Sequence, residues 1–318
     1  MTGLVNDGNG TLYAGLRHST TIPLDCTALI RPEPLQFEQG LAQVRDDRTQ
    51  GAAELARACL RLLVDSALTI TAASTSDWRC ALLERAERLA ECRPSMAAIR
   101  HLVECWQMTV IPRVNARPLD EARRIAAAVG RDLIEQSRQA TEQAAEQLAR
   151  FLGAGRVLMT HSLSSTIMGV FTRLAAQGVS AIVTESRPLY EGRRLAERLS
   201  ALDIPTTLIT DAQMGLFVAR AHAVVVGADS RLPDGSLINK AGTYLLALAA
   251  RDQGVPFYVC SERFKQRQPA WGAPEFESMD PCELGAPGWT CVTVENVYFD
   301  RTPARLISGW FDEQGLGC

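Results

Sequence analysis

The sequence predicts an α/β protein in which a helical N-terminal part precedes a doubly wound parallel sheet. Two observations support this fold class. In the first half, apolar residues recur at helical spacing. After Gly153, short apolar runs alternate with amphipathic stretches of about ten residues, a pattern typical of strand–helix–strand units with parallel strands. We therefore expect a helical domain at 1–152 and a sheet domain at 153–318.

Four amphipathic segments make up the predicted helical half. The first covers Phe37–Leu68, and the second runs over 77–92 with an aspartate as its N-cap. Pro94 follows the second helix and breaks it, because a proline biases the preceding residue away from the helical conformation. The third helix ends before Pro112, and a long fourth helix occupies 118–152.

Short apolar runs are the predicted strands, and the stretches between them are the predicted helices. The strands are expected at Arg156–Thr160, Ala181–Thr184, Thr206–Ile209, Ala223–Val226, Phe257–Cys260 and Cys291–Val294. The helices are expected near 165–177, 191–202, 211–220, 240–253 and 303–314. Because ligands bind beyond the carboxyl ends of the strands in such a sheet, the residues that follow each strand are candidates for a site.

The composition argues against several classes of protein. The chain has 318 residues, of which 47% are hydrophobic and 22% charged, as in soluble globular proteins. A net charge of −3 argues against non-specific nucleic-acid binding, and no apolar run is long enough to span a membrane. The N-terminus has no secretory signal, and the nine cysteines include no CxxC pair, so we expect reduced thiols in a cytoplasmic protein.

We expect neither a cofactor nor a metal. Gly153 and Gly155 precede a strand rather than follow one, so they are not a dinucleotide-binding fingerprint, and the sequence contains no P-loop. His18, His101 and His222 lack the spacing of metal ligands.

Only two of the 33 basic residues are lysine, Lys240 and Lys265. An ammonium group is a compact point charge that binds phosphate from a flexible stem, and a guanidinium cannot replace it in a tight pocket. Either lysine alone could equally be a residue without a special role. Both are close in sequence to Asp229, at segment ends that would meet in one cleft, so we expect a shared site for an anionic ligand.

Polar residues follow two of the predicted strands. Ser164, Ser165 and Thr166 open a helix, where hydroxyl and N–H groups bind phosphate, although ordinary helix capping explains them equally well. Asp229 follows a fully apolar run, so partial burial would raise its pKa and suit it to proton transfer near neutral pH. The alternative role for this aspartate is a cap or a turn.

Other segment ends carry further polar residues. Asn239 and Lys240 would begin a helix, where a pair of donors could bind a phosphate or a hydroxyl group. Glu185 and Arg187 are more simply explained as a structural ion pair. Ser162 lies in no Gly-x-Ser-x-Gly turn, so a Ser-His-Asp hydrolase is not expected.

These motifs, in this order, resemble one family: the alpha, beta and delta regulatory subunits of eukaryotic initiation factor 2B, together with ribose-1,5-bisphosphate isomerase and methylthioribose-1-phosphate isomerase. The matching stretches are Thr160–Thr166, Glu185–Gly192, Leu208–Asp211, Val226–Ser230, Asn239–Tyr244, Pro256–Val259 and Phe299–Pro303. The likeness is strong from about residue 153 onward. It is weaker, but present, at Gln50–Glu54 and Arg93–Met96.

The resemblance implies a Rossmann-like sheet domain with a sugar-phosphate site in the cleft that it forms with the helical domain. The isomerases of this family open a sugar ring and move a carbonyl from C1 to C2. Asp229 matches their acid/base aspartate. The positions that match substrate- or phosphate-binding residues are Gly51, Ala52, Arg93, Asn239, Lys240 and Lys265. The family also implies a homo-oligomer, a dimer or a higher assembly.

Two positions depart from the pattern of the isomerases. Ser162 stands where they carry a catalytic cysteine, and a serine without a base is a far poorer proton acceptor than a thiol. Gln50 stands where the substrate loop usually has an arginine. Cys260, which ends the strand before Lys265, is a candidate substitute for the missing thiol.

From these residues we expect an aldose–ketose isomerase that acts on a phosphorylated pentose similar to ribose 1,5-bisphosphate. Asp229 and Ser162 occupy its catalytic positions. Ser164, Ser165 and Thr166 join the phosphate-binding residues. The alternative is a non-catalytic regulatory protein that senses a sugar phosphate or a nucleotide, a reading that the loss of the cysteine favours.

Overall fold

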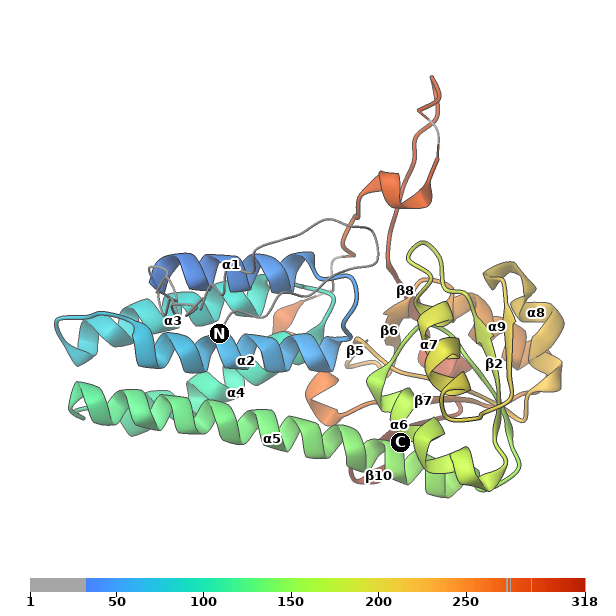
Figure 1. Cartoon of the computed structure of the whole chain (residues 1–318), viewed down its shortest axis with the longest axis horizontal. Helices are drawn as coiled ribbons and strands as arrows, with labels where there is room; N and C mark the ends of the chain where they lie inside the picture. Colours follow the sequence, from blue (N-terminus) through green and yellow to red (C-terminus); the bar gives the residue numbers. More distant parts are fainter. Residues whose placement is uncertain (1–32, 273, 275, 287, 318) are drawn as a thin grey trace, which may run out of the picture. The chain divides into compact units, whose positions relative to one another are not determined.

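The computed structural model describes residues 33–317 apart from 273, 275 and 287. Five helices come first, followed by a mostly parallel sheet with interleaved helices, so the expected fold class is confirmed (Figure 1). The helices are α1 (Glu33–Asp46), α2 (Ala52–Thr69), α3 (Thr75–Glu91), α4 (Ala97–Val114) and α5 (Leu119–Leu152). Residues 1–32 of the predicted N-terminal domain lie outside the described residues.

The first predicted helix, Phe37–Leu68, is two helices in the structure. The Asp47 carboxylate accepts hydrogen bonds from the backbone N–H groups of Thr49 and Gln50, which forms a turn after α1. Gly51 then precedes α2 as its N-cap. The predicted end before Pro112 is also wrong, because α4 continues to Val114, and core packing around its last turns outweighs the lost hydrogen bond.

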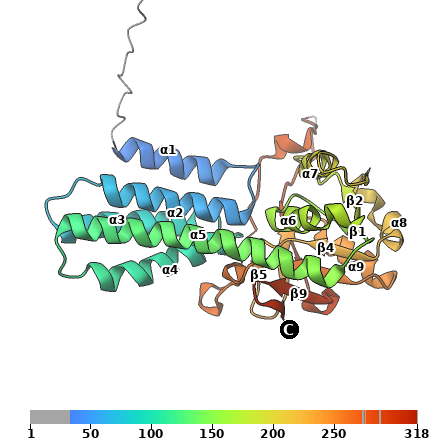
Figure 2. The same ribbon diagram turned by 60° about the horizontal axis from the view of Figure 1, so that its bottom comes forward.

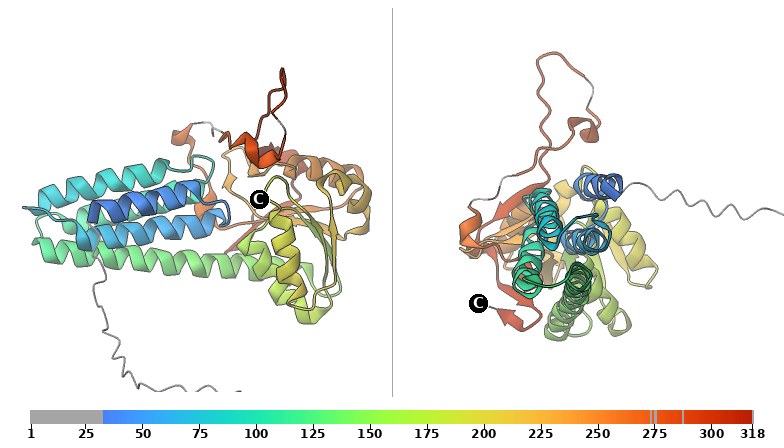
Figure 3. Two further views of the ribbon diagram at one scale, coloured as in Figure 1. Left: turned by 45° about the horizontal axis from the view of Figure 1, so that its top comes forward. Right: turned by 90° about the vertical axis from the view of Figure 1, so that its left-hand side faces the viewer.

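The helices pack around an apolar core that includes Trp78 and Trp106, both of which are fully buried with their indole N–H groups bonded to backbone carbonyls. Figure 3 (right) shows the helices of this part nearly end-on. The long helix α5 packs against α2 and α4, and its last turns pack against α6 and β9 (Figure 2). Since α5 contacts both parts of the chain, the division at 152/153 stays a prediction.

A seven-stranded sheet has the strand order β10-β9-β7-β4-β1-β2-β3 and is parallel apart from β10. Its strands are β1 (Val157–Thr160), β2 (Ser180–Thr184), β3 (Thr206–Ile209), β4 (Ala223–Val226), β7 (Phe257–Cys260), β9 (Gly309–Asp312) and β10 (Gly315–Gly317). The connecting helices are α6 (Ser165–Leu174), α7 (Glu191–Ser200), α8 (Met214–Phe217) and α9 (Thr243–Asp252). The order reverses between β1 and β4, which is where such sheets bind ligands.

A second, antiparallel sheet consists of β5 (Ser230–Arg231), β6 (Leu237–Lys240) and β8 (Phe299–Thr302). The prediction that Asn239 and Lys240 begin a helix is therefore wrong. Both residues end β6, and Gly242, with a φ of 107° that favours glycine, separates this strand from α9.

Two other predicted elements are wrong. Cys291–Val294 is not a strand, and its side chains are mostly exposed. The expected helix at 303–314 is instead a short 3₁₀ turn followed by β9 and β10, because Trp310 and Phe311 are buried in the sheet and Gly309 and Gly315 bound the strands. None of the helices in the described part of the chain combines the length and the apolar content needed to span a bilayer.

Candidate functional site

A cavity of about 740 Å³, including its open mouth, lies where the helical part meets the carboxyl ends of β1 and β4. All of the residues predicted for the site line this cavity, apart from Thr166. They are Gly51, Ala52, Arg93, Ser162, Ser164, Ser165, Asp229, Asn239, Lys240 and Lys265.

Thr166 lies behind the cavity wall. Its side chain is fully buried, and its hydroxyl donates to Glu262 Oε1 at 3.3 Å. The first turn of α6 therefore gives two serines to the cavity, while the third hydroxyl contacts a residue that pairs with Lys265.

Asp229 lies just after β4, and hydrogen bonds of its backbone groups hold it in place. Its N–H donates to Ile238 O at 3.0 Å, and its carbonyl accepts from Ala97 N at 3.2 Å. Burial raises the pKa of its carboxyl to about 6, although Lys265, Arg93 and Lys240 all favour the charged form. A carboxyl of this kind can both take and return a proton near neutral pH.

Lys265 forms a buried ion pair inside the cavity wall. Its Nζ lies 3.0 Å from Glu262 Oε2, and the two side chains are 4% and 0% exposed. Burial alone would lower the pKa of Lys265, but the Glu262 carboxylate outweighs this effect and raises it above its ordinary value. Glu262 is the partner of this pair, and its pKa is lowered despite burial because Lys265 and a hydrogen bond from Thr141 favour the carboxylate. Both groups are therefore charged.

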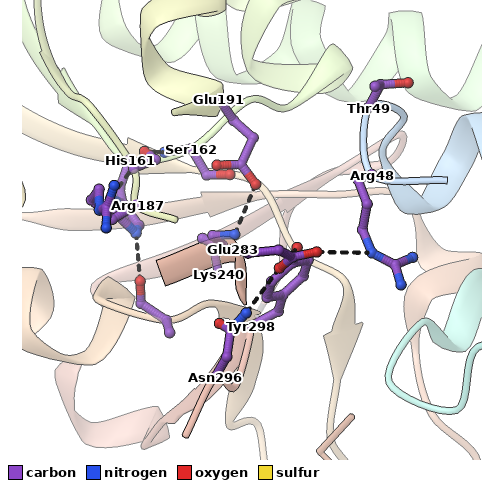
Figure 4. A network of polar contacts seen from close by, with 12 residues as sticks. Arg48, Thr49, His161, Ser162, Arg187, Glu191, Lys240, Glu283, Asn296 and Tyr298 are labelled. Carbon is purple, nitrogen blue, oxygen red and sulfur yellow. Dashed lines mark hydrogen bonds and ion pairs between the residues drawn. The ribbon is translucent and has the colours of Figure 1, made fainter. Parts of the chain in front are cut away.

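Lys240 is paired in a different way. Its Nζ donates to Glu191 Oε1 at 2.8 Å and lies 4.1 Å from the centre of the Tyr298 ring, a cation–π contact. Figure 4 shows Glu191 directed toward Lys240, with Ser162 and His161 close by on the sheet side. Glu191 is the first residue of α7 and lines the cavity, but the sequence analysis did not select it.

Two arginines reach the cavity from the helical part. Arg93 donates from Nε to Glu277 Oε2 at 3.0 Å and from Nη1 to Asp47 O at 3.1 Å. Arg48 lies 3.8 Å from Glu283, which also accepts hydrogen bonds from Asn296 and from the Tyr298 hydroxyl (Figure 4).

Arg48 is a site residue that the sequence analysis missed. Gln50 lacks the positive charge expected in this loop, and Arg48 provides a guanidinium two positions earlier. The sequence did contain an indication of this role, because Arg48 stands next to a polar turn in the same loop. Only the structure shows that the turn around Asp47 directs it into the cavity.

Close backbone approach shapes the sheet side of the cavity. A Cβ at Gly227 would collide with the Ser164 side chain, and a Cβ at Gly192 would collide with the carbonyl of Thr184. Glycine at these positions lets the start of α6 pack against the end of β4, and the start of α7 against the end of β2. The N-termini of α2, α6 and α7 all border the cavity, and their partial positive charges favour anionic groups.

Ser162 has a φ of 66°, in the left-handed region, and its N–H donates to Ser186 Oγ at 2.8 Å. Among the described residues, none accepts a hydrogen bond from its hydroxyl, so no neighbour is placed to take its proton. The neighbouring His161 is buried, and both of its ring nitrogens take part in hydrogen bonds. Its Nε2–H donates to Ala241 O, its Nδ1 accepts from Thr184, and burial lowers its pKa, which keeps the ring neutral.

The structure rules out Cys260 as a substitute for the missing thiol. Its Sγ donates to Ala144 O on α5 at 3.3 Å, and Cys260 is not among the residues that line the cavity. Burial raises the pKa of this thiol well above its ordinary value. The expected pair of Glu185 and Arg187 is also wrong, because Glu185 pairs with Arg193 at 2.8 Å and Arg187 donates to Leu284 O.

Among the described residues there is no group of three or more His, Cys, Asp or Glu side chains that could hold a metal ion. The cavity lining offers carboxylates, ammonium and guanidinium groups, hydroxyls and helix N-termini. This set suits binding of a phosphorylated polyol and proton transfer on it.

Residues 48–317 match the sequence pattern of the Initiation factor 2 subunit family. The chain belongs to this family. Its relatives include both initiation-factor-like proteins and isomerases. A Pyrococcus abyssi protein named as translation initiation factor eIF-2B subunit 2-like is 34% identical over 289 residues, which cover 87% of this chain and 94% of the relative.

A ribose 1,5-bisphosphate isomerase of Haloferax volcanii is 30% identical over 283 residues, or 84% of each chain. Among solved structures, the translation initiation factor eIF-2B of Pyrococcus horikoshii OT3 superposes with a TM-score of 0.76 at 30% identity, over 88% of this chain and 96% of that one. Membership of the Initiation factor 2 subunit family and the α/β fold are thus confirmed, while the relatives divide between two kinds of named function.

Proposed function

We propose that this member of the Initiation factor 2 subunit family is an aldose–ketose isomerase that acts on a phosphorylated pentose in the cavity at the β1 and β4 ends. One observation carries the proposal. The cavity presents a buried carboxyl, Asp229, whose pKa of about 6 lies near physiological pH, and it is surrounded by Arg93, Lys240 and Lys265. The isomerase among its relatives supports the reaction class.

For an aldose with a free C1 oxygen, such as ribose 5-phosphate, the reaction moves a carbonyl from C1 to C2 of the open-chain sugar. A base removes the proton from C2, the carbonyl oxygen at C1 gains a proton, and an enediol forms. C1 then gains a proton while the C2 hydroxyl loses one, so the product is the ketose. No electron leaves the sugar, and the reaction therefore needs no redox cofactor.

A single carboxylate can carry the proton from C2 to C1. Asp229 is suited to this role, because a group with a pKa near 6 is a stronger base than an ordinary aspartate and still releases the proton readily. The ammonium groups of Lys240 and Lys265 would stabilise negative charge on the enediol oxygens. In this scheme Ser162 contacts the sugar but does not act as the base.

A second candidate is a non-catalytic sensor of a sugar phosphate or a nucleotide. Ser162 favours it, because no described neighbour is placed to activate its hydroxyl. The Pyrococcus abyssi relative is named for translation initiation rather than for an isomerase. A sensor would need the cationic groups and the helix N-termini of the cavity, but it would have no use for a proton carrier.

The test is turnover of ribose 5-phosphate and of ribose 1,5-bisphosphate, followed by ¹H and ¹³C NMR. The wild type should form the ketose, Asp229→Asn should lose about 10²–10⁴-fold in rate, and Ser162→Ala should stay within about 10-fold. Thermal stabilisation by a ligand without turnover would support the sensor instead. If neither sugar phosphate binds or reacts, the isomerase and the sugar-phosphate sensor are both contradicted.

A further inference from the structure

We propose that the cavity takes a pentose with a single phosphate and discriminates against bisphosphates, and that Glu191 is the residue that sets this choice. The inference rests on the proposed function and narrows its substrate. It departs from the expectation of a ligand similar to ribose 1,5-bisphosphate.

Each cation that lines the cavity already has a carboxylate partner. The pairs are Arg48 with Glu283, Arg93 with Glu277, Lys240 with Glu191, and Lys265 with Glu262. Three further carboxylates, Asp47, Glu54 and Asp229, line the same cavity. Together with Glu191 they make four lining carboxylates among the described residues, as many as the four lining cations. A phosphate monoester brings a charge of about −1.5 to −2 at pH 7 and a bisphosphate brings about twice that, so the second phosphate meets an environment without a positive excess.

Lys240 illustrates why the second phosphate is disfavoured. The ammonium donates to Glu191 at 2.8 Å and lies against the Tyr298 ring at 4.1 Å, and its side chain is only 6% exposed. A phosphate that approached Lys240 would have to displace Glu191 or lie beside it. Two negative groups sharing one ammonium repel each other, and like charges at a binding site are a strong means of discrimination.

The free oxygens of the carboxylates fit a different ligand group. Glu191 Oε2 and Glu54 Oε2 are buried, and neither has a hydrogen-bond partner among the described residues. A buried acceptor is stabilised by a donor, and a sugar hydroxyl supplies one, whereas a phosphate dianion supplies none. The side of the cavity at Glu191 therefore suits hydroxyl groups.

The helix N-termini and the Lys265 ammonium group that remain in the cavity can hold one phosphate. Gly51, the N-cap of α2, has no side chain to satisfy the first backbone N–H groups of the helix, and Ala52 and Ala53 line the cavity. Ser165 at the start of α6 lines the same cavity. Lys265 Nζ lies 3.0 Å from Glu262 Oε2, and an ammonium group carries three N–H donors, so it can still donate to an anion.

The experiment measures the affinity of ribose 5-phosphate and ribose 1,5-bisphosphate for the full chain by isothermal titration calorimetry. Wild type should bind the monophosphate at least about 10-fold more tightly. Glu191→Gln removes the charge, keeps an acceptor and frees Lys240, so the bisphosphate should gain about 10-fold while the monophosphate changes by less than about 3-fold.

Glu185→Gln is the matched control. Glu185 lies in the same segment between β2 and α7 and pairs with Arg193 at 2.8 Å, but it does not line the cavity. It should leave both affinities unchanged. If wild type binds the bisphosphate as tightly as the monophosphate, the inference is overturned. It is also overturned if Glu191→Gln changes the affinities for the two ligands by the same factor. Failure of both ligands to bind wild type contradicts the proposed function itself.

Discussion

The two sides of the cavity are built differently. The sheet side, defined by Asp229, Lys240 and Lys265, lies at or just after strand ends, and its lysines pair with carboxylates from neighbouring ordered elements. On the helical side, Arg48 and Arg93 lie in connections between helices. Their partners, Glu283 and Glu277, come from residues 272–297, whose described part contains the 3₁₀ turn Pro281–Leu284 and none of the strands of the two sheets.

This difference teaches that a buried ion pair can have two roles. On the sheet side, Glu262 and Lys265 are 0% and 4% exposed and three residues apart, so neither can reach water if its partner is lost. On the helical side, Glu277 and Glu283 are 16% and 19% exposed, so water can reach each carboxylate. The ion pairs on the sheet side hold their side chains in fixed positions, whereas the ion pairs on the helical side can rearrange when a ligand binds.

The largest expected effect is on the sheet side. Lys265→Met should lower the free energy of unfolding by about 3–5 kcal/mol, because it leaves Glu262 charged and unpaired in the interior. Arg93→Met, the matched change on the helical side, should cost much less, about 1 kcal/mol, because Glu277 can turn toward water. Urea unfolding at pH 7 measures both, and equal losses would contradict the comparison.

The next effect concerns pH. The pKa of Asp229 is raised to about 6 in the folded chain, above 3.8, so folding disfavours its carboxylate. This penalty is absent below pH 3.8, grows as pH rises, and is complete above pH 6, where it reaches about 3 kcal/mol. Asp229→Asn should therefore be more stable than wild type at pH 8 and progressively less so toward pH 4. A stability difference that does not vary with pH would show that the carboxyl is not held in a buried state.

The smallest effect is expected at Arg48 and Glu283. Their groups are 3.8 Å apart and 29% and 19% exposed, so Glu283→Gln should change the free energy of unfolding by less than about 1 kcal/mol. It should nevertheless raise the affinity for ribose 5-phosphate, because it frees Arg48 for the anion. Thermal shift measurements with and without ribose 5-phosphate test both the change in stability and the change in affinity. Weaker binding would mean that Glu283 positions Arg48 rather than competes for it.

The same contrast explains what the sequence could predict. Asp229 was found because ligands bind where parallel strands end, and the two lysines were found because the chain has no others. Asn239 and Lys240 were found even though their predicted helix is a strand. They were chosen for their donor groups, and those groups reach the cavity from the end of β6.

Arg48, Glu191 and the carboxylate partners were not found, for a physical reason. Arg93 and Glu277 are 184 residues apart, and no local pattern of spacing or charge connects them. Similarly, the short β9 was taken for part of a helix at 303–314. Its place in the sheet is decided by packing of Trp310 and Phe311 rather than by propensity.

One measurement tests the central claim, that a single anionic-ligand cavity gathers both lysines. Since the chain has only Lys240 and Lys265, protein grown with ¹³C,¹⁵N-lysine gives two sets of side-chain NMR signals, and Glu191→Gln assigns the one from Lys240. Titration with ribose 5-phosphate should shift both sets with one dissociation constant. Signals that stay in place while the ligand binds, or that move with two different constants, would contradict the account.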